Sequence, residues 1–392
     1  MKTILAITWM NLRNVGSRLG TSLVIVVGIA GVVGVLVSML SMSRGFERTL
    51  AGTGSESRAL LLSAGVISEL SSGISRDAVP LIASLPGISR GADGQPLVSA
   101  ETMVITELKR PDPPYGALNV ALRGVEPAGL AMRREVKLAE GRWFQTGLNE
   151  VVAGRGAQRQ FGGVAVGTVL HFRGSQWTVV GIFESGGDAH ESELWTDANT
   201  ARNAFGRPGA SSLLVQLESP AALAPLQAAL KADPRFQLEA QSERHYYESQ
   251  SQSFTDRLGV LTGILVTLMA IGALFGALNT MYSAVSARSR EIATLRAIGF
   301  SGAPVVASVL VEAVVLAVAG GSLGAAVSYA LFNGMTVSTI GGNFTQVAFS
   351  FAVTPDLLQK GLLWSIGIGL IGGLAPALRA ARLPVVDALR AA

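Results

Sequence analysis

Four long apolar segments divide the chain, at residues 19–43, 258–285, 304–332 and 361–378, and together they hold one charged side chain, Glu312. An α-helix rises about 1.5 Å per residue, so roughly 20 apolar residues cross the ~30 Å hydrocarbon core of a bilayer. The pattern therefore predicts four transmembrane helices. A cleaved signal peptide is the alternative for the first segment, but its apolar run exceeds the ~7 to 15 residues of such peptides and no small-residue cleavage site follows it.

Residues 44–257, between the first two apolar segments, have the pattern of a folded domain, because short apolar runs alternate there with turn residues. We expect a mixed α/β domain with a β-rich part over residues 138–197. Its last part, residues 242–257, is polar, helical in pattern and continuous with the second apolar segment, which predicts a rigid stalk helix. The other expected elements are a helix at 75–85, strands at 98–106 and 118–125, a hairpin over 169–183 that turns at Gly174 and Ser175, and a strand–helix–strand unit at 213–217, 220–232 and 236–240.

The composition is typical of a protein that lies partly in a membrane. Of the 392 residues, 49% are hydrophobic and 15% are charged, which is unusual for a soluble enzyme. The sequence has no cysteine, so disulfides and thiolate metal sites are excluded. The domain at 44–257 must therefore be stabilised by its own apolar core, for which about 200 residues are enough.

Basic residues outside that domain indicate the orientation of the helices, because lysine and arginine collect on the cytoplasmic side of membrane proteins. Ten basic residues lie outside 44–257, and all except Lys360 lie before the first apolar segment, between the second and third, or after the fourth. Both termini and the loop at 286–303 are thus expected in the cytoplasm, with 44–257 and 333–360 outside. The nine residues are Lys2, Arg13, Arg18, Arg288, Arg290, Arg296, Arg379, Arg382 and Arg390.

Both ends of the chain are expected at the cytoplasmic surface. Residues 1–18 place Trp9 and other apolar side chains near one helical face, which predicts an interfacial helix on the cytoplasmic leaflet, with a simple tail as the alternative. Residues 379–392 are expected to form a cytoplasmic tail.

The loop at 286–303 has the pattern of a short amphipathic helix, because apolar residues recur at helical spacing, charges lie on other faces, and a glycine is placed to end the helix. A helix of this kind outside the bilayer offers a surface to a partner protein. A basic loop that only satisfies the orientation rule is an equal alternative. The candidate coupling residues are Arg288, Arg290, Glu291, Ile292, Leu295, Arg296, Ile298 and Gly299.

Glycine pairs at four-residue spacing recur in three of the apolar segments. Such pairs let helix backbones approach closely in lipid, so we expect these helices to pack together or to dimerise. The pairs are Gly259 and Gly263, Gly272 and Gly276, Gly320 and Gly324, and Gly369 and Gly373.

Glu312 lies within the third apolar segment, where a carboxylate needs a partner or a raised pKa. A structural acid paired with Arg288, Arg290, Arg296 or a helix terminus is the favoured interpretation, and a proton relay or substrate contact is the alternative.

One group of potential metal ligands stands out in the domain: Asp188, His190, Glu191 and Glu193. Their spacing fits neither a zinc template nor a calcium-binding loop. We therefore expect a solvated loop in preference to a metal site.

Several stretches of the chain resemble the MacB-like family of ABC transporter permeases, of the macrolide-exporter and lipoprotein-release type, with an FtsX-like permease domain. The resemblance lies in ARSREIATLRAIGFS (287–301), in the acid and glycines of the third segment, and in the entry helix ITWMNLRNVGSRLGTSLVIVVGI (7–29). PALRAARLPVVDALRAA (376–392) resembles the terminal motif, with Leu383 and Asp387 as departures. The domain at 44–257 resembles the family's periplasmic core through VALRGVEPAGL, LAEGRWF, NEVVAGRGAQRQF and QWTVVGIFESGG.

The resemblance implies a non-catalytic, multi-pass permease subunit of the cell inner membrane. A separate ABC ATPase would bind ATP and Mg²⁺, because no G-x-x-x-x-G-K-[ST] phosphate loop occurs in the sequence. The implied partners are that ATPase, a second copy or a paralogous permease, a periplasmic adaptor and membrane lipid, with no nucleic acid. The expected function is export or extraction of a lipophilic or amphipathic substrate. The alternatives are a mechanotransmission subunit that activates an envelope enzyme or signal, and a membrane enzyme, which the few histidines disfavour.

Overall fold

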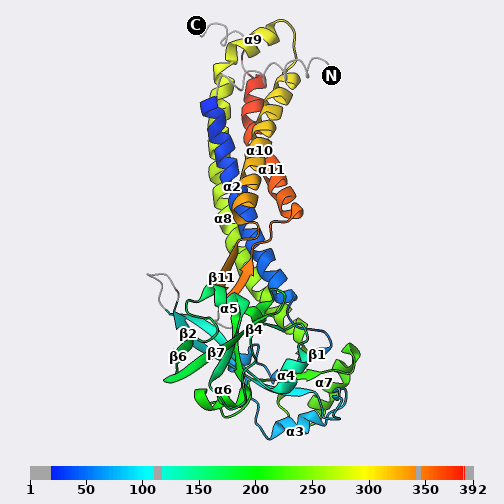
Figure 1. The fold of residues 1–392 in the computed structure, drawn as a ribbon. Coiled ribbons are helices and arrows are strands. Elements are labelled where there is room, and N and C mark those ends of the chain that lie inside the picture. Colours follow the sequence, from blue (N-terminus) through cyan, green and yellow to red (C-terminus); the bar gives the residue numbers. More distant parts are fainter. Residues whose placement is uncertain (1–18, 110–116, 341–345, 383, 385–392) are drawn as a thin grey trace. The chain divides into compact units, whose positions relative to one another are not determined.

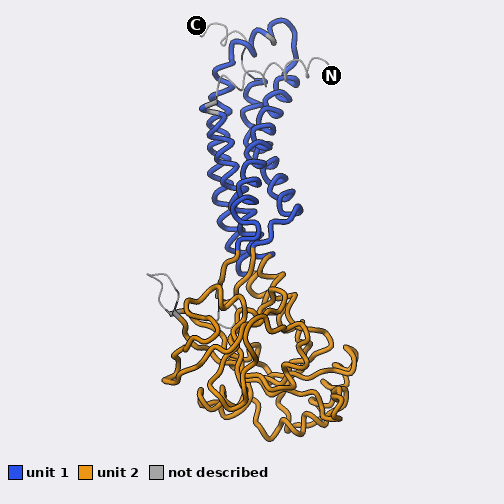
Figure 2. Tube along the Cα trace, viewed as in Figure 1, with its two compact units in different colours: residues 1–44, 257–335, 351–392 blue, residues 45–256, 336–350 orange. Residues whose placement is uncertain are grey.

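The computed structural model describes residues 19–109, 117–340, 346–382 and 384, and the predicted interfacial helix at 1–18 lies outside them. The chain divides into two compact units (Figure 2). Unit 1 comprises residues 1–44, 257–335 and 351–392, and unit 2 comprises residues 45–256 and 336–350.

Unit 1 is helical. Among the described residues, four helices that contribute to unit 1 are long and apolar enough to cross a membrane, which confirms the predicted number (Figure 1). Residues from all four, with the short helix α9, form one apolar core that includes Ile29, Ala317 and Ala377. The helices are α2 (Leu19–Ala51), α8 (Glu243–Ala287), α9 (Ser289–Ala297), α10 (Gly302–Phe332) and α11 (Pro355–Arg382).

Two of these helices are longer than a bilayer requires. Helix α8 has 45 residues and α2 has 33, which at 1.5 Å per residue is about 68 Å and about 50 Å. A hydrocarbon core of ~30 Å accommodates only part of either helix. Helix α8 is continuous from residue 243, in agreement with the stalk helix expected at 242–257.

Unit 2 is a mixed α/β domain, as predicted. Among the described residues, ten strands form one sheet in the order β10-β1-β9-β2-β3-β8-β5-β7-β4, with β6 paired to β7. The strands are β1 (Arg58–Ser63), β2 (Val98–Lys109), β3 (Ala117–Val125), β4 (Lys137–Gly141), β5 (Glu150–Gly154), β6 (Val169–Phe172), β7 (Ser175–Glu184), β8 (Glu193–Asp197), β9 (Ser212–Gln216) and β10 (Leu238–Ser242). The helices are α3 (Ala78–Ala83), α4 (Pro127–Met132), α5 (Arg155–Gln160), α6 (Ala198–Phe205) and α7 (Leu223–Ala232), with short 3₁₀ turns η2 (Glu69–Ser71), η3 (Ala189–Ser192) and η4 (Pro220–Ala222).

Among the described residues, apolar side chains of the sheet pack in several clusters, of which two are large. The predicted strand–helix–strand unit is β9-α7-β10, whose strands flank β1 and are both antiparallel to it. Leu226 and Leu230 of α7 pack with Leu61 and Leu213 in the first core. The second core fills the β-rich part expected at 138–197 and includes the fully buried Trp177.

Two local predictions need correction. The hairpin between β6 and β7 turns at Arg173 and Gly174, one residue earlier than predicted, because both residues have positive φ, 53° and 71°, as a two-residue turn with matching twist requires. The segment at 333–360, expected as a plain loop, contains an antiparallel pair of strands, β11 (Thr336–Ile340) and β12 (Gln346–Ser350). Each strand has only 5 residues, which is too few for an alternation of apolar and polar residues to be clear in the sequence.

Candidate functional site: the α9 corner and a buried charge cluster

Helix α9 is the amphipathic helix expected in the loop at 286–303. Its Ile292 and Ala293 are buried, whereas Arg290 and Glu291 are exposed and Ile298 is 68% exposed. The helix ends at Ala297, and Gly299 follows with a φ of 99°, which is the left-handed conformation that favours glycine after a helix. The α9 residues thus separate into a face that packs within unit 1 and an exposed face; the Leu295 side chain lies outside the described part.

Two arginines hold α9 in place. Arg288, at the corner between α8 and α9, donates from Nη1 to Glu312 Oε2 at 2.8 Å, and both side chains are buried. Arg296 donates from Nη1 to the carbonyl oxygen of Ala381 on α11 at 2.8 Å. Glu312 is therefore paired with Arg288, one of the partners expected for a structural acid at this position. A buried ion pair that loses one partner leaves a costly unpaired charge, so the pair restricts where the corner can lie.

The glycine pairs separate into two groups. A Cβ on Gly324 would lie 2.4 Å from the Ala30 carbonyl oxygen of α2, and one on Gly369 would lie 2.5 Å from Ala317 Cβ of α10. Gly320 and Gly373 are similarly close to α2 and α10. These two pairs allow close helix packing within the chain. The pairs on α8, at 259 and 263 and at 272 and 276, have no described atom within 4 Å of the place where a Cβ would lie.

In unit 2, charged side chains gather where α8 begins. Arg123 of β3 is 1% exposed and pairs with three carboxylates: Glu69 at 2.8 Å, Glu101 at 3.0 Å and Glu193 at 2.8 Å. Burial alone would lower the pKa of Arg123, but Glu193 and Glu69 raise it well above its ordinary value. We refer to the following residues as the buried charge cluster: Arg58, Glu69, Glu101, Arg123, Arg133, His190, Glu193 and Glu243.

The first turn of α8 is tied into this cluster. Glu243 accepts from Arg58 Nε of β1 at 2.6 Å and from Arg133 Nε at 3.3 Å. Arg133 also pairs with both oxygens of Glu101 on β2. Ion pairs that are buried and hydrogen-bonded on several sides fix geometry more strongly than exposed pairs do. The start of the stalk is therefore bound to β1, β2 and the end of α4 by charged groups.

Two family models match the chain. The MacB-like periplasmic core domain matches residues 19–233, more than half of the sequence, and the FtsX-like permease C-terminal domain matches residues 263–385. The chain belongs to the MacB-like family of ABC transporter permeases. This confirms the resemblance found in the sequence motifs.

Individual relatives of this permease match over shorter stretches. The uncharacterized ABC transporter permease YknZ of Bacillus subtilis (strain 168) is 27% identical over 207 residues, 51% of this chain and 49% of that protein. The macrolide export ATP-binding/permease protein MacB 1 of Yersinia pestis bv. Antiqua (strain Antiqua) is 36% identical over 129 residues, 33% of this chain and 19% of that protein. The matches thus span about half or less of these relatives.

Solved structures of outer domains are also similar to this permease. The periplasmic region of MacB from Actinobacillus actinomycetemcomitans is 15% identical, with 50% of this chain and 94% of that one covered and a TM-score of 0.37. The extracellular domain of YknZ is 15% identical, with 47% and 100% covered and a TM-score of 0.35.

The solvated loop predicted for this permease around Asp188 is wrong. Asp188, His190 and Glu193 are all buried, and His190 Nδ1 lies 3.3 Å from Glu193 Oε2. The described residues contain no group of three or more histidines and acids placed to hold a metal ion. His190 of η3 and Glu193 at the start of β8 are buried within the charge cluster, and Asp188 accepts hydrogen bonds from Ser185 Oγ and the His190 N–H; sequence spacing did not reveal these contacts.

Burial and charge shift the protonation of these groups. Burial raises the pKa of Asp188 to about 6. Burial alone would lower the pKa of His190, but Glu193 and Asp188 raise it above its ordinary value. A cationic His190 together with three arginines balances the four glutamates of the buried charge cluster. Its Nε2 has no hydrogen-bond partner among the described residues, and the nearest carboxylate oxygen is Glu243 Oε1 at 4.0 Å.

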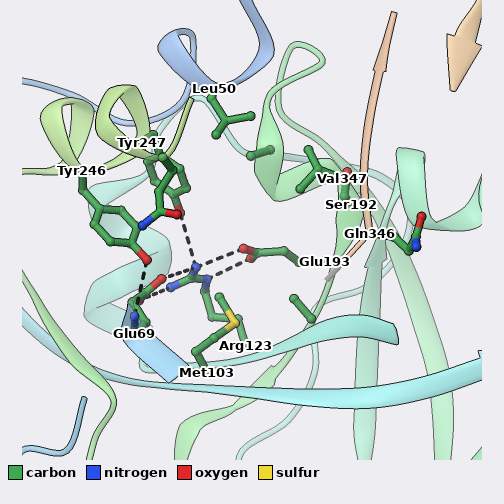
Figure 3. A pocket seen from close by; sticks show the side chains of 13 residues that line it. Leu50, Glu69, Met103, Arg123, Ser192, Glu193, Tyr246, Tyr247, Gln346 and Val347 are labelled. Carbon is green, nitrogen blue, oxygen red and sulfur yellow. Dashed lines mark hydrogen bonds and ion pairs between the residues drawn. The ribbon is translucent and has the colours of Figure 1, made fainter. Parts of the chain in front are cut away.

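A small cavity of about 50 Å³ lies beside the cluster (Figure 3). Figure 3 shows Arg123 between Glu69 and Glu193, with the hydroxyl of Tyr247 3.3 Å from Arg123 Nη2. Tyr246 and Tyr247 of α8 line the cavity on one side, and Gln346 and Val347 of β12 line it on another. The volume admits one or two water molecules and no larger ligand.

Sequence reasoning did not find the buried charge cluster. Its members are far apart in the chain, and each one alone resembles an ordinary surface charge. One signal was present: Glu101 and Arg123 lie inside the strands predicted at 98–106 and 118–125, and charged residues are almost never fully buried unless they are paired.

Proposed function

We propose that this chain is the membrane subunit of an ABC-type complex in which a separate ATPase, with its ATP and Mg²⁺, moves the outer domain through α9 and α8. In this proposal both termini and α9 lie in the cytoplasm, and unit 2 lies on the outer side. The substrate class is a lipophilic or amphipathic molecule that is exported or extracted on that side, as the membership in the family and the position of the large domain favour.

The exposed face of α9 is the observation that carries the proposal. Ile298 is 68% exposed beside the exposed Glu291 and Arg290, although the opposite face is well packed. An apolar side chain rimmed by charges is typical of a protein-binding surface. Because Arg288 is paired with Glu312, a push on α9 acts directly on the corner of α8 and on α10.

Helix α8 supplies the path toward the outer domain. It is one helix from Glu243 to Ala287, and its first turn is bound into the buried charge cluster. A continuous helix transmits an axial displacement or a tilt better than a chain of loops does, because its backbone hydrogen bonds resist bending. Displacement of the end near Arg288 is thus expected to move Glu243 and the strands that hold it.

A second copy of the chain is the partner that we propose for α8. Both glycine pairs of this helix are open, and so are large apolar side chains such as Leu268 and Phe275. Glycines on the packed helices α10 and α11 are in contact inside the chain, so the open pairs on α8 are available for close approach between copies.

Co-purification from membranes tests the function. The full chain is expected to retain a nucleotide-binding subunit, whereas Glu291→Arg combined with Ile298→Asp is expected to lose at least nine-tenths of it. The matched control is Lys360→Glu, a charge reversal at the exposed first turns of α11, which is expected to retain the subunit. The proposal fails if the wild type retains no ATPase, or if the double variant binds it as well as the control does.

A further inference from the structure

The strand pair β11–β12 connects α10 to α11 and belongs to unit 2. Helix α10 ends at Phe332 and α11 begins at Pro355, so the pair lies close in sequence to both membrane helices. Phe349 of β12 is 2% exposed and Gln346 is 8% exposed. Such burial shows that the pair is seated against other parts of unit 2.

An aromatic contact fixes one side of the pair. The Phe349 ring meets the Phe46 ring edge-on, with centroids 5.5 Å apart, and Phe46 lies 4.1 Å from Phe254. Phe46 belongs to α2 and Phe254 to α8. Phe46 has no exposed surface. At this buried ring, α2 and α8 therefore meet the strand pair that connects α10 to α11.

Gly45 makes this approach geometrically allowed. A Cβ at this position of α2 would lie 2.2 Å from the Ser350 carbonyl oxygen and 3.2 Å from the Phe349 ring. Backbone atoms cannot yield to such a contact without moving the strand. A glycine in the middle of a helix lowers helix stability, so its presence here fits a need for close packing.

Polar contacts fix the other side of the pair. The Ala348 N–H donates to Ser192 Oγ at 2.9 Å, and Gln160 Nε2 donates to Gln346 Oε1 at 3.3 Å. Ser192 lies in η3, two residues from His190 of the buried charge cluster. Gln346 also lines the cavity next to Arg123 (Figure 3). The strand pair therefore contacts the segment that carries part of the cluster.

We infer that Gly45 and Phe349 are positioning residues that seat β11–β12 against η3, so that movement of α10 and α11 reaches the buried charge cluster through β12 and η3, in addition to the route through Glu243 in the first turn of α8. The inference rests on the proposed function for the source of the movement. The seating itself is a property of the chain alone. The strand pair stays docked throughout the cycle and acts as a fixed connection.

Hydrogen exchange on the full chain in lipid nanodiscs, without nucleotide or partner, tests the seating. Gly45→Ala is expected to accelerate exchange at least tenfold at the Ala348 amide and at residues 189–193. Gly31→Ala is the matched control, because its new methyl group has Met269 at 3.9 Å and requires no shift, and it is expected to stay within twofold of wild type. Phe349→Leu, which keeps most of the apolar volume, is expected to lie between the two. Equal exchange in Gly45→Ala and Gly31→Ala overturns the inference.

A disulfide tests whether the docked state transmits movement. The chain has no cysteine, so Ser192→Cys with Ala348→Cys introduces a single pair. With an ATPase partner and a non-hydrolysable nucleotide, wild type is expected to change exchange at residues 189–197 at least threefold. Gly45→Ala is expected to lose that change. When the cysteine pair is added to Gly45→Ala, the oxidised protein is expected to regain the change and the reduced protein is not. A purely structural contact would alter only the unfolding temperature.

The two proposals fail in different ways. If wild type shows no nucleotide response, the proposed function is wrong, and the nucleotide-free exchange still decides the seating. If wild type responds but the oxidised pair abolishes the response, the strand pair must undock during the cycle and the inference is overturned.

Discussion

Replacing Arg123 with methionine tests whether the buried charge cluster holds unit 2 together. The substitution keeps an unbranched side chain that extends as far as the position of Nε, and it removes every donor that Arg123 gives to Glu69, Glu101 and Glu193. Those carboxylates are at most 7% exposed, and the one or two water molecules that the neighbouring cavity admits carry no charge to balance them. We therefore expect an uncompensated cluster of negative charge inside the domain.

The expected cost is a large part of the stability of the domain. Removing one partner of a buried ion pair costs about 3–5 kcal/mol, against a total of about 5–15 kcal/mol for a folded domain. A domain of this size loses roughly 2–4 °C in its unfolding midpoint per kcal/mol, so a decrease of about 6–20 °C is expected. The pKa of Glu193 is lowered in the folded protein because Arg123 and His190 outweigh burial, so without Arg123 this carboxyl binds a proton more readily. The deficit should therefore be smaller at pH 5 than at pH 8.

Thermal unfolding of the full chain in nanodiscs, followed by tryptophan fluorescence, measures the effect, since Trp143, Trp177 and Trp195 all lie in unit 2. Arg235→Met is the matched control, because Arg235 pairs with Asp233 on the surface and is 68% exposed. Exposed pairs contribute little, so the control should melt with wild type. Equal midpoints for the two variants, or a deficit that grows toward acid pH, would refute the reasoning.

Three further predictions concern the pH response and the two groups of glycines. The folded-state pKa of Asp188 is raised from 3.8 to about 6, so the stability that this carboxyl contributes is full below pH 3.8 and is lost as pH rises through 6. In the same melting assay, Asp188→Asn should therefore be more stable than wild type by on the order of 2–3 kcal/mol above pH 7 and equally stable below pH 4. An opposite dependence on pH would disprove this. Gly324→Val should separate α10 from α2 and lower the yield of monodisperse protein in size-exclusion chromatography, whereas Gly276→Val should fold normally; similar profiles would contradict the packing. A cysteine at Gly263 should give an oxidised dimer on gels, whereas one at the exposed Leu363 of α11 should not, and the reverse pattern would argue against a second copy at α8.

Several elements were predictable because local pattern is enough to determine them. The four membrane helices follow from the apolar length, and the hairpin at β6–β7 follows from alternation around a turn residue. The amphipathic helix α9 follows from the spacing of Ile292 and Ile298 and from Gly299. The Glu312 pair was narrowed to three arginines or a helix terminus because a carboxylate in an apolar helix needs a partner, and Arg288 is the one that the structure selects.

Other features depend on residues that are far apart in the chain. Arg123 meets Glu69 and Glu193 from different strands and turns, and no local pattern predicts that meeting. The prediction that Asp188 and His190 are solvated was wrong for the same reason. Both residues are buried by contacts with segments that are distant in the chain. The seating of β12 beside Phe46 depends likewise on a contact between residues about 300 positions apart.

The sequence by itself determined which segments can enter a membrane, where the large domain lies along the chain and which family it belongs to, because hydropathy and short motifs are properties of consecutive residues. Only the tertiary structure decided which glycines are in contact and which are open, which arginine pairs with Glu312, and where the charged residues of unit 2 gather. These features depend on distances in space between segments, and the number of residues between two segments does not indicate whether they are in contact.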